Sequence, residues 1–420
     1  MSWLAAVRNW PSGKRLEIAS IGKAPRQAAR VGPAAALWLA AICAAILFSR
    51  KPCQFLNPQF HMEDGTEYFQ TILDGHGFAS VFMPHSGGQL FTLQRLFAWL
   101  LSPLPVRWMP HAYFAVALLG TLAACLYVFR SRVDSRFRWL MALAVVSVYV
   151  GWGRVFLHLL NLHWILALVL ITMLISPEPR SRAGRIAETI AAFLLGVTGP
   201  FGLLLCPLFI ARALWQRTPH AVWLMAATMF AAGCQLATIE PTRRGGAVDL
   251  SDPHWGRFLG RHMAGSLFFG DWCDRIPIAE TWFQVLGIVL AWHLVRYIVR
   301  SRDWQVAGLV CVGTLIFAAA AWSWRAWPEE VDHPGYRYHF IPTVCLAWSL
   351  LLIAERSREY RPKAIVALAF MALAAATAWR LRPLPDRNWA EASKCIGGPV
   401  PCRIPIDPDP MYVAYMPRPK

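Results

Sequence analysis

The stretch VGPAAALWLAAICAAILFS, Val31 to Ser49, contains no charged residue. It is long enough to cross the hydrocarbon core of a bilayer, which takes about 17 to 25 residues. The basic segment 1–30 precedes it, so this apolar run begins too far along the chain for a cleavable signal peptide. We therefore expect a retained signal anchor, with segment 1–30 in the cytoplasm.

Similar apolar runs recur along all 420 residues, and the composition agrees with them. The chain is 56% hydrophobic and only 15% charged, with a mean hydropathy of +0.40, whereas a soluble protein carries about 25% charge. The sequence predicts an all-α polytopic membrane protein whose membrane domain covers 31–380. About eleven spans are expected, near 31–49, 110–129, 138–153, 158–176, 186–199, 201–214, 220–238, 278–295, 304–323, 339–354 and 363–379.

The net charge of +17 is carried mainly by arginines in short loops between the apolar runs. This pattern is typical of cytoplasmic loops beside anionic lipid headgroups, so we expect membrane lipids and no nucleic acid as partners. Strict alternation of eleven spans places every such basic loop inside. The N-terminus is then cytoplasmic, and the C-terminal tail 381–420 lies outside.

Two segments leave the topology open. Residues 88–105 are apolar enough for a span, but counting them would place the basic loop near residue 130 outside, so we interpret them as an interfacial helix. Residues 186–214 contain TGPFG at 198–202, and a Gly-Pro pair breaks a helix. This segment is expected to form a short hairpin of two spans, and a single kinked helix is the alternative.

Four sizeable segments fall outside in this topology: 50–109, 239–277, 324–338 and the tail 381–420. None is large enough to hold a core of its own, and the tail could at most cap the membrane domain. Cys395 and Cys402 lie in the tail, where an oxidising compartment would allow them to pair. The cysteine pattern does not indicate a zinc site.

The first outer segment contains QFHMEDGTEYF, Gln59 to Phe69, with the carboxylates Glu63, Asp64 and Glu67. A solvated acidic loop is the simplest interpretation. The alternative is a catalytic carboxylate held at the outer face of the membrane.

The later outer segments are rich in arginine, against the positive-inside tendency. Guanidinium groups bind phosphate with two parallel hydrogen bonds, and a phosphate at the outer leaflet is most simply that of a lipid. Ion pairs with nearby acids are the alternative. The arginines concerned are Arg243, Arg244, Arg257, Arg261, Arg275, Arg325 and Arg337.

Polar groups also occur at the outer end of the fourth predicted span. There we expect His158, Asn161 and Leu162 to share one helical face, with His163 and Trp164 on its flank. They could be interfacial anchors, but they fall on the same side of the membrane as the acids and arginines.

A carboxylate, arginines and apolar walls suit the transfer of a sugar from a polyprenyl phosphate to an acceptor hydroxyl. The carboxylate would act as general base, and the arginines would stabilise charge on the departing phosphate. The sequence has no Gly-rich phosphate loop and no cytoplasmic domain for a nucleotide sugar, so no cofactor is expected.

The layout resembles the GT-C superfamily of integral membrane glycosyltransferases. The resemblance covers most of the chain in layout, but in motif only EDGTEYFQTILDGHGFASVF with GGQLFTLQRLFAWL, GVTGPFGLLLCPLFIARAL and YRYHFIPTVCLAWSLLL. It implies juxtamembrane helices in the first outer loop near 68–83 and 88–103. It also implies an outward-facing cavity and inverting transfer from a polyprenyl-phosphate sugar to a glycan or lipid-linked acceptor.

Carried over by position, the resemblance implies a role for each candidate residue. The general base falls on Asp64 or Glu63, with Asp64 slightly favoured. The donor phosphate would be bound by Arg337 and Tyr338, with Arg243, Arg244 and Arg261 as further candidates. The sugar or acceptor would be bound by His163, Asn161, Trp164, Glu67 and Arg95. No separated pair of acids is found, so metal-dependent transfer is not indicated.

Two other functions stay open. A transporter or flippase of a lipid-linked sugar also needs outward arginines, but it commonly shows inverted repeats and charged residues near the membrane midplane, which this sequence lacks. An O-antigen-type polymerase need not carry acids in the first loop. The resemblance and the paired cysteines favour modification of lipopolysaccharide or another surface glycan at the periplasmic face of a bacterial inner membrane, with undecaprenyl phosphate as the carrier lipid.

Overall fold

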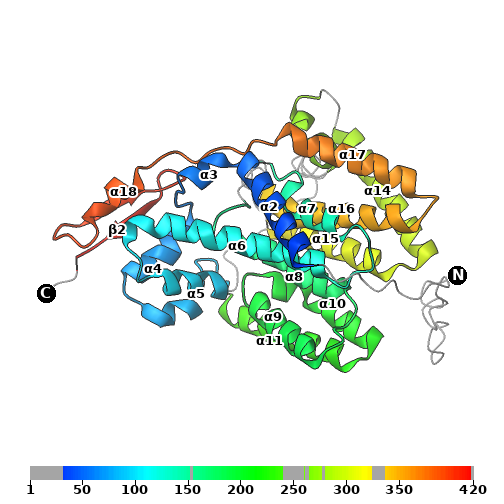
Figure 1. Cartoon of the computed structure of the whole chain (residues 1–420), viewed down its shortest axis with the longest axis horizontal. Coiled ribbons are helices and arrows are strands. Elements are labelled where there is room, and N and C mark those ends of the chain that lie inside the picture. Colours follow the sequence, from blue (N-terminus) through cyan, green and yellow to red (C-terminus); the bar gives the residue numbers. More distant parts are fainter. Residues whose placement is uncertain are drawn as a thin grey trace.

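A computed structural model describes residues 32–151, 155–239, 260, 264–276, 280–323 and 336–417. Within these ranges the protein is built mainly of helices, and a small hairpin of strands lies near the C-terminus (Figure 1).

A helix occupies each position where a membrane span is predicted. These helices are α2 (Pro33–Arg50), α6 (Met109–Arg130), α7 (Arg138–Ser147), α8 (Leu162–Ile175), α9 (Arg182–Gly196), α10 (Phe201–Gln216), α11 (Pro219–Thr238), α14 (Glu280–Ser301), α15 (Trp304–Ser323), α16 (Tyr336–Arg356) and α17 (Arg361–Thr377). In the described part of the chain, six helices are long and apolar enough to cross a membrane: α2, α6, α11, α14, α15 and α16. Helices α7, α8 and α10 are apolar but shorter. The protein is thus compatible with an integral membrane protein, while the count of eleven spans and their sidedness stay predictions.

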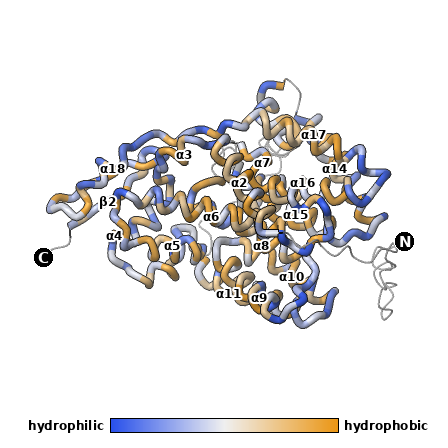
Figure 2. Tube along the Cα trace, viewed as in Figure 1, coloured by the Kyte–Doolittle hydropathy of each residue, from blue (hydrophilic) through white to orange (hydrophobic). Residues whose placement is uncertain are grey.

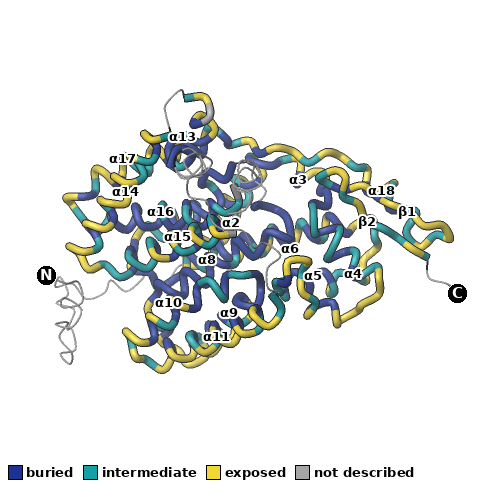
Figure 3. Tube along the Cα trace, turned by 180° about the vertical axis from the view of Figure 1, so that it is seen from behind, coloured by how far each residue is buried: buried dark blue, intermediate teal, exposed yellow. Residues whose placement is uncertain are grey.

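Helix α8 lies at the centre of the helical assembly. It is apolar on all sides and almost every residue of it is buried, as expected for a helix enclosed by other helices. Helices α6, α9, α10, α15 and α16 contact it. Exposure is concentrated on the peripheral helices (Figure 3). On α14 the exposed side chains include Trp282, Ile288 and Trp292, and apolar residues run along the outer helices as well as the centre (Figure 2).

The spans predicted at 138–153 and 158–176 are wrong at the ends that face each other. Helix α7 stops at Ser147 and α8 begins only at Leu162, and the described residues between them form buried, non-helical chain. His158 and Asn161 therefore do not share a helical face with Leu162; Asn161 is the N-cap of α8. An apolar run has the same hydropathy in either conformation, so periodicity does not distinguish them.

Two separate helices form the segment 186–214, as the predicted hairpin requires, and their crossing of the membrane stays a prediction. Helices α9 and α10 are separate and contact each other, and Gly199 adopts a φ of +86° in the short connection between them. Glycine tolerates this left-handed conformation without strain. The alternative of a single kinked helix is wrong.

The first outer segment is a chain of short helices. They are α3 (Pro52–Leu56), the π-helix η1 (Asp64–Phe69), α4 (Gln70–Leu73), η2 (Gly77–Phe82), α5 (Thr92–Leu101) and η3 (Val106–Trp108). Both predicted juxtamembrane stretches are therefore largely helical. Helix α5 has only 10 residues, so it does not cross a bilayer; its position at the membrane surface stays a prediction.

The tail contains α18 (Trp389–Ala392), η7 (Ser393–Cys395) and the strands β1 (Cys402–Pro405) and β2 (Tyr412–Tyr415). The strands pair antiparallel, with Cys402 opposite Tyr415, so the all-α prediction misses a small sheet. The predicted disulfide between Cys395 and Cys402 is confirmed.

The tail packs on the first outer segment: β2 lies beside α4 (Figure 1), and α18 contacts η3. Gln70 donates to the Ala414 carbonyl and accepts from the Ala414 N–H, both at 2.8 Å. His61 Nδ1 lies 2.9 Å from Asp407 Oδ2. The tail therefore caps the first outer segment.

Candidate functional site

One carboxylate of the acidic segment, that of Asp64, points into the interior of the protein. Asp64 starts η1 and is only 2% exposed, so a fully solvated acidic loop is ruled out at this position. Its Oδ1 accepts a 2.6 Å hydrogen bond from the Leu160 N–H, in the non-helical segment before α8. The segment that the sequence predicted as helix is thus the one that holds Asp64.

Two buried bases lie behind Asp64. Lys51 Nζ is 2.7 Å from His158 Nε2, and His158 Nδ1 is 3.8 Å from Asp64 Oδ2. All three side chains are buried. The ring of His61 packs against that of His158 with centroids 4.7 Å apart. These residues form a buried row of titratable groups from the end of α2 to the acidic segment.

The environment of Asp64 favours its protonated form. Burial raises its pKa to about 8, and the negative charge of Glu63 acts in the same direction, against the hydrogen bonds from Leu160 and Leu159 and the charge of Lys51. At neutral pH this carboxyl therefore holds its proton most of the time. Strongly shifted carboxyls of this kind are frequent at functional sites.

The surroundings of Glu63 shift its pKa in the opposite direction to that of Asp64. Burial alone would raise its pKa, but hydrogen bonds to His85 and to its own backbone N–H, together with the charges of His85 and Arg337, lower it. Its Oε1 lies 3.5 Å from His85 Nε2. Arg337 belongs to α16, so the structure brings the acid of the first outer segment into the field of the arginine that precedes the tenth predicted span.

Glu67 and Arg95 are tied to each other within the first outer segment. Arg95 donates from one Nη to Glu67 Oε2 at 3.3 Å and to the Pro84 carbonyl at 3.2 Å, and its other Nη donates to Thr71 Oγ1. Glu67 Oε1 lies 3.2 Å from His85 Nε2. Both residues therefore have partners in this segment, which holds His85 between Glu63 and Glu67.

Aromatic rings line the side of the site formed by α8 and α16. Trp164 packs edge-on against Phe201 at 4.9 Å and against Tyr338 at 5.2 Å between centroids. The Arg337 guanidinium lies 5.3 Å from the Tyr338 ring centroid. Trp164, Tyr338 and Arg337 thus form one continuous contact, as expected if they act together.

His163 lies beside this aromatic group, at the start of α8. Its Nδ1 is 2.7 Å from the Leu160 carbonyl and 3.3 Å from Gln94 Nε2. Its ring packs against Phe91 at 4.8 Å. A Cβ at Gly199 would lie 2.9 Å from this ring, so the glycine of the α9–α10 connection is needed for the packing.

Several buried polar atoms around Asp64 have no hydrogen-bond partner among the described residues. They are Tyr68 Oη, Gln94 Oε1, Arg95 Nε and Glu63 Oε2. Tyr68 is 1% exposed, and burial followed by the charge of Asp64 raises the pKa of its phenol. Buried polar atoms without partners are rare, and they mark places where water or a ligand completes the site.

The structure thus brings together most of the predicted site residues, from four separate parts of the chain. They are Glu63, Asp64, Glu67, Arg95, Asn161, His163, Trp164, Arg337 and Tyr338. The predicted phosphate ligands Arg243, Arg244 and Arg261 lie outside the described residues.

Sequence reasoning missed His85, Gln94 and Lys51. His85 lies in the stretch PHSGG, and Lys51 is the second charged residue after the first apolar run. In the sequence, both therefore look like ordinary loop residues. Gln94 occupies the buried face of α5, opposite the face expected to meet lipid. A polar residue among the apolar positions of an amphipathic helix was the one available signal.

The site shows no arrangement typical of a resident metal. Across the described ranges, no group of three or more His, Cys, Asp or Glu side chains is placed to hold a metal ion. The chemistry available from these residues is proton transfer at the carboxyls and charge stabilisation at the arginines.

Comparison with known proteins adds no assignment to this geometry. No family model, no curated protein and no solved structure matches the chain.

Proposed function

We propose that the protein is a membrane glycosyltransferase of the GT-C type, which transfers a sugar from a polyprenyl phosphate to an acceptor hydroxyl with inversion. The observation that carries this proposal is that Arg337, which adjoins the aromatic contact of Tyr338 with Trp164, is close enough for its charge to help lower the pKa of Glu63. An ionised carboxylate and a guanidinium at one site match the two charges that develop in such a transfer.

In this mechanism, the acceptor oxygen attacks the anomeric carbon of the donor sugar. The bond between that carbon and the phosphate oxygen breaks, and its electron pair stays on the departing polyprenyl phosphate. Glu63 takes the proton of the acceptor hydroxyl, and Arg337 stabilises the phosphate. Tyr338 fixes the guanidinium through the contact of its ring.

The geometry supports different roles for Glu63 and Asp64. The Glu63 side chain is 19% exposed, and its Oε2 has no partner among the described residues, so it can reach a bound hydroxyl. Its lowered pKa keeps it ionised at neutral pH. Asp64 is buried, engaged with Leu160 and mostly protonated. We therefore assign the base to Glu63 and a positioning role to Asp64, although the resemblance slightly favours Asp64.

The wider setting of the proposal follows the predicted topology. The site faces the periplasm of a bacterial inner membrane, undecaprenyl phosphate carries the sugar, and the acceptor is lipopolysaccharide or another surface glycan. The apolar helices supply the walls for the lipid tail, and the tail segment with its disulfide lies on the same side as the site.

The test measures the mass of the surface glycan in cells that lack the gene and are complemented with wild type or variants. Glu63→Gln should reduce sugar incorporation by about 10²–10⁴-fold, as expected for loss of a general base. Arg337→Ala should weaken donor use, and Arg337→Lys should recover part of it. Glu391→Gln and Arg403→Ala serve as matched controls, because both residues are exposed and on the same predicted side.

The outcomes separate the alternatives. Normal incorporation in both Glu63→Gln and Asp64→Asn would reject the general-base mechanism. Loss in Asp64→Asn alone, in correctly folded protein, would reverse the two roles. A transporter would be indicated if cells that lack the gene accumulated the lipid-linked sugar on the cytoplasmic face, and if the Glu63 and Asp64 variants restored its export.

A further inference from the structure

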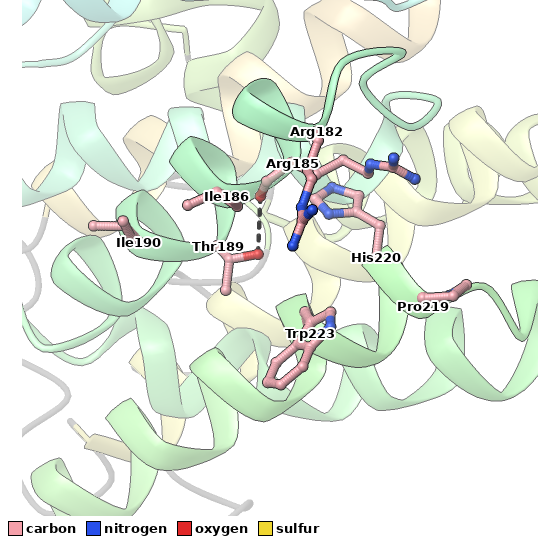
Figure 4. A pocket seen from close by; sticks show the side chains of 8 residues that line it. All are labelled: Arg182, Arg185, Ile186, Thr189, Ile190, Pro219, His220 and Trp223. Atoms are coloured by element: carbon pink, nitrogen blue, oxygen red, sulfur yellow. Dashed lines mark hydrogen bonds between the residues drawn. The ribbon is translucent and has the colours of Figure 1, made fainter.

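A groove lies between the first turns of α9 and α11, on the predicted cytoplasmic side of the protein. Its volume is about 430 Å³, in the range of small-molecule sites. Figure 4 shows Arg182, Arg185 and His220 toward one end of the groove and Ile190 toward the other. The proposed transfer reaction uses none of these residues.

The basic end of the groove has polar groups that could still bind a ligand. In the part of the chain that the structure describes, the guanidinium groups of Arg182 and Arg185 make no ion pair and no hydrogen bond. His220 is 2% exposed, and its Nε2 lies 3.1 Å from Glu188 Oε2. Its Nδ1 is buried and has no hydrogen-bond partner among the described residues. One ring nitrogen is thus fixed by a carboxylate, and the other remains for a ligand.

Glu188 does not neutralise the arginines of the groove. Its Oε1 accepts from Tyr127 at 2.8 Å and from Arg132 at 2.5 Å, so its nearest arginine is not one of the groove. His220 therefore connects Glu188 to the lining of the groove.

Two helix N-termini meet at the same place. Helix α9 begins after its N-cap Ser181, and α11 begins after its N-cap Thr218, with Pro219 and His220 in the first turn. Neither first turn contains an acidic residue. The positive ends of two helix dipoles and two arginines therefore repel one another until an anion binds.

The other end of the groove is apolar and open to the surroundings. Ile186, Ile190 and Trp223 are 52%, 54% and 64% exposed. Farther along α9 and α11 the exposed side chains are also apolar, including Leu194 and Phe230. A ligand that fills the groove therefore has an anionic group at one end and hydrocarbon at the other.

We propose that this groove binds the phosphate headgroup of an anionic phospholipid in the cytoplasmic leaflet, with its acyl chain along Ile186, Ile190 and Trp223. Arg182 and Arg185 donate to the phosphate oxygens, and His220 lines the same end of the groove. A soluble phosphate would leave the apolar end uncovered. A phospholipid with a net neutral headgroup would bring a cation into a basic site.

Native mass spectrometry of the full-length protein in detergent tests this site, with added phosphatidylglycerol or phosphatidylcholine as the probe. Wild type should retain phosphatidylglycerol in preference to phosphatidylcholine. Arg182→Gln with Arg185→Gln should lower the retained fraction by about fivefold or more, in line with the worth of a basic residue at an anionic lipid. Glutamine keeps the helix propensity of this first turn.

The control pair is Arg302→Gln with Arg358→Gln, which removes the same charge from exposed residues of other predicted cytoplasmic loops. Equal loss in both pairs would overturn the proposal, because binding would then follow net charge alone. Displacement of the lipid by millimolar inorganic phosphate would overturn the part played by the apolar end. Equal retention of both lipids by the wild type would also reject an anionic site.

Discussion

Glu63 and Asp64 are neighbours in the chain, yet their pKa values shift in opposite directions. Burial and the charge of Glu63 raise the pKa of Asp64, whereas His85 and Arg337 overcome burial and lower the pKa of Glu63. Consecutive residues of a helix point in different directions. One carboxyl therefore enters the protein while the other reaches the edge of the site.

This difference makes the stability of the protein depend on pH through Asp64. Its pKa is about 8 in the folded protein against an ordinary value of 3.8. Between these values the folded state holds a proton that the unfolded state releases, so the free energy of unfolding falls as pH rises toward 8. We expect Asp64→Asn to remove this dependence. Between pH 5 and pH 8 the wild type should lose on the order of 5 °C more in Tm than the variant.

Thermal unfolding in detergent at several pH values measures the effect. Asp74→Asn is the matched control, because Asp74 lies in the same outer segment but is exposed and bonded only to Gln70. Parallel pH profiles for wild type and Asp64→Asn would show that Asp64 is ionised in the folded protein.

At the scale of secondary structure, two arginines close the C-terminal ends of the shortest apolar helices. Arg50 donates to the Val146 and Val148 carbonyls at the end of α7, at 2.7 and 3.0 Å. Arg212 donates to the carbonyls of Met173, Leu174 and Ser176 at the end of α8. A cation at a helix C-terminus binds orphan carbonyls and complements the dipole.

We expect Arg212→Gln to destabilise the protein by about 1.5–3 kcal/mol, because buried carbonyls would lose a charged donor. The Tm should fall, and the retained helix should show faster amide exchange at the end of α8. Arg217→Gln provides the comparison, because Arg217 is exposed and donates only to Leu214. A similar loss of Tm in the two variants would argue against the capping role.

The sequence predicts the elements well where they are long or bounded by a breaker. The first span and the α9–α10 hairpin are examples, because a Gly-Pro pair marks the end of a helix. It fails between Val148 and Asn161, where the described residues are buried without being helical, and hydropathy does not distinguish a buried helix from other buried chain. The end of α7 depends on Arg50, almost one hundred residues earlier in the chain. No local pattern contains that contact.

At the scale of the whole molecule, the C-terminal tail covers the first outer segment. Gln70 pairs with Ala414, His61 pairs with Asp407, and Trp389 packs against Phe60 at 4.7 Å between centroids. The disulfide between Cys395 and Cys402 joins η7 to β1. The tail thus holds the segment that carries Glu63 and Asp64.

We expect Cys395→Ser with Cys402→Ser to loosen the tail, since a disulfide around a short loop contributes about 2 kcal/mol. Limited proteolysis should cut the variant in 381–417 faster than the wild type, and Tm should fall. Cys311→Ser is the control, because Cys311 is an exposed free cysteine in α15. Unchanged proteolysis would mean that the side-chain contacts alone fix the tail.

The composition of the candidate site was more predictable than its geometry. His163, Trp164 and Arg337 could be predicted as candidates because each lies at the edge of an apolar run, and the acids because they lie in the first predicted outer segment. The assignment of Glu67 and Arg95 to sugar or acceptor stays a prediction, and the structure bonds these two residues to each other. His85 was missed since its role comes from two acids about twenty residues earlier in the chain.

The shortness of α7 and α8 determines how deep in the membrane the candidate site would lie. Ten and fourteen residues reach only about 15 and 21 Å along a helix axis, against a hydrocarbon layer of about 30 Å. Non-helical backbone is tolerated at such depth only when protein encloses it, as the segment that holds Asp64 is enclosed. For a lipid-carried sugar, the reaction would then take place below the headgroup plane. The carrier would keep its whole tail in the bilayer, and the acceptor would have to descend to meet it.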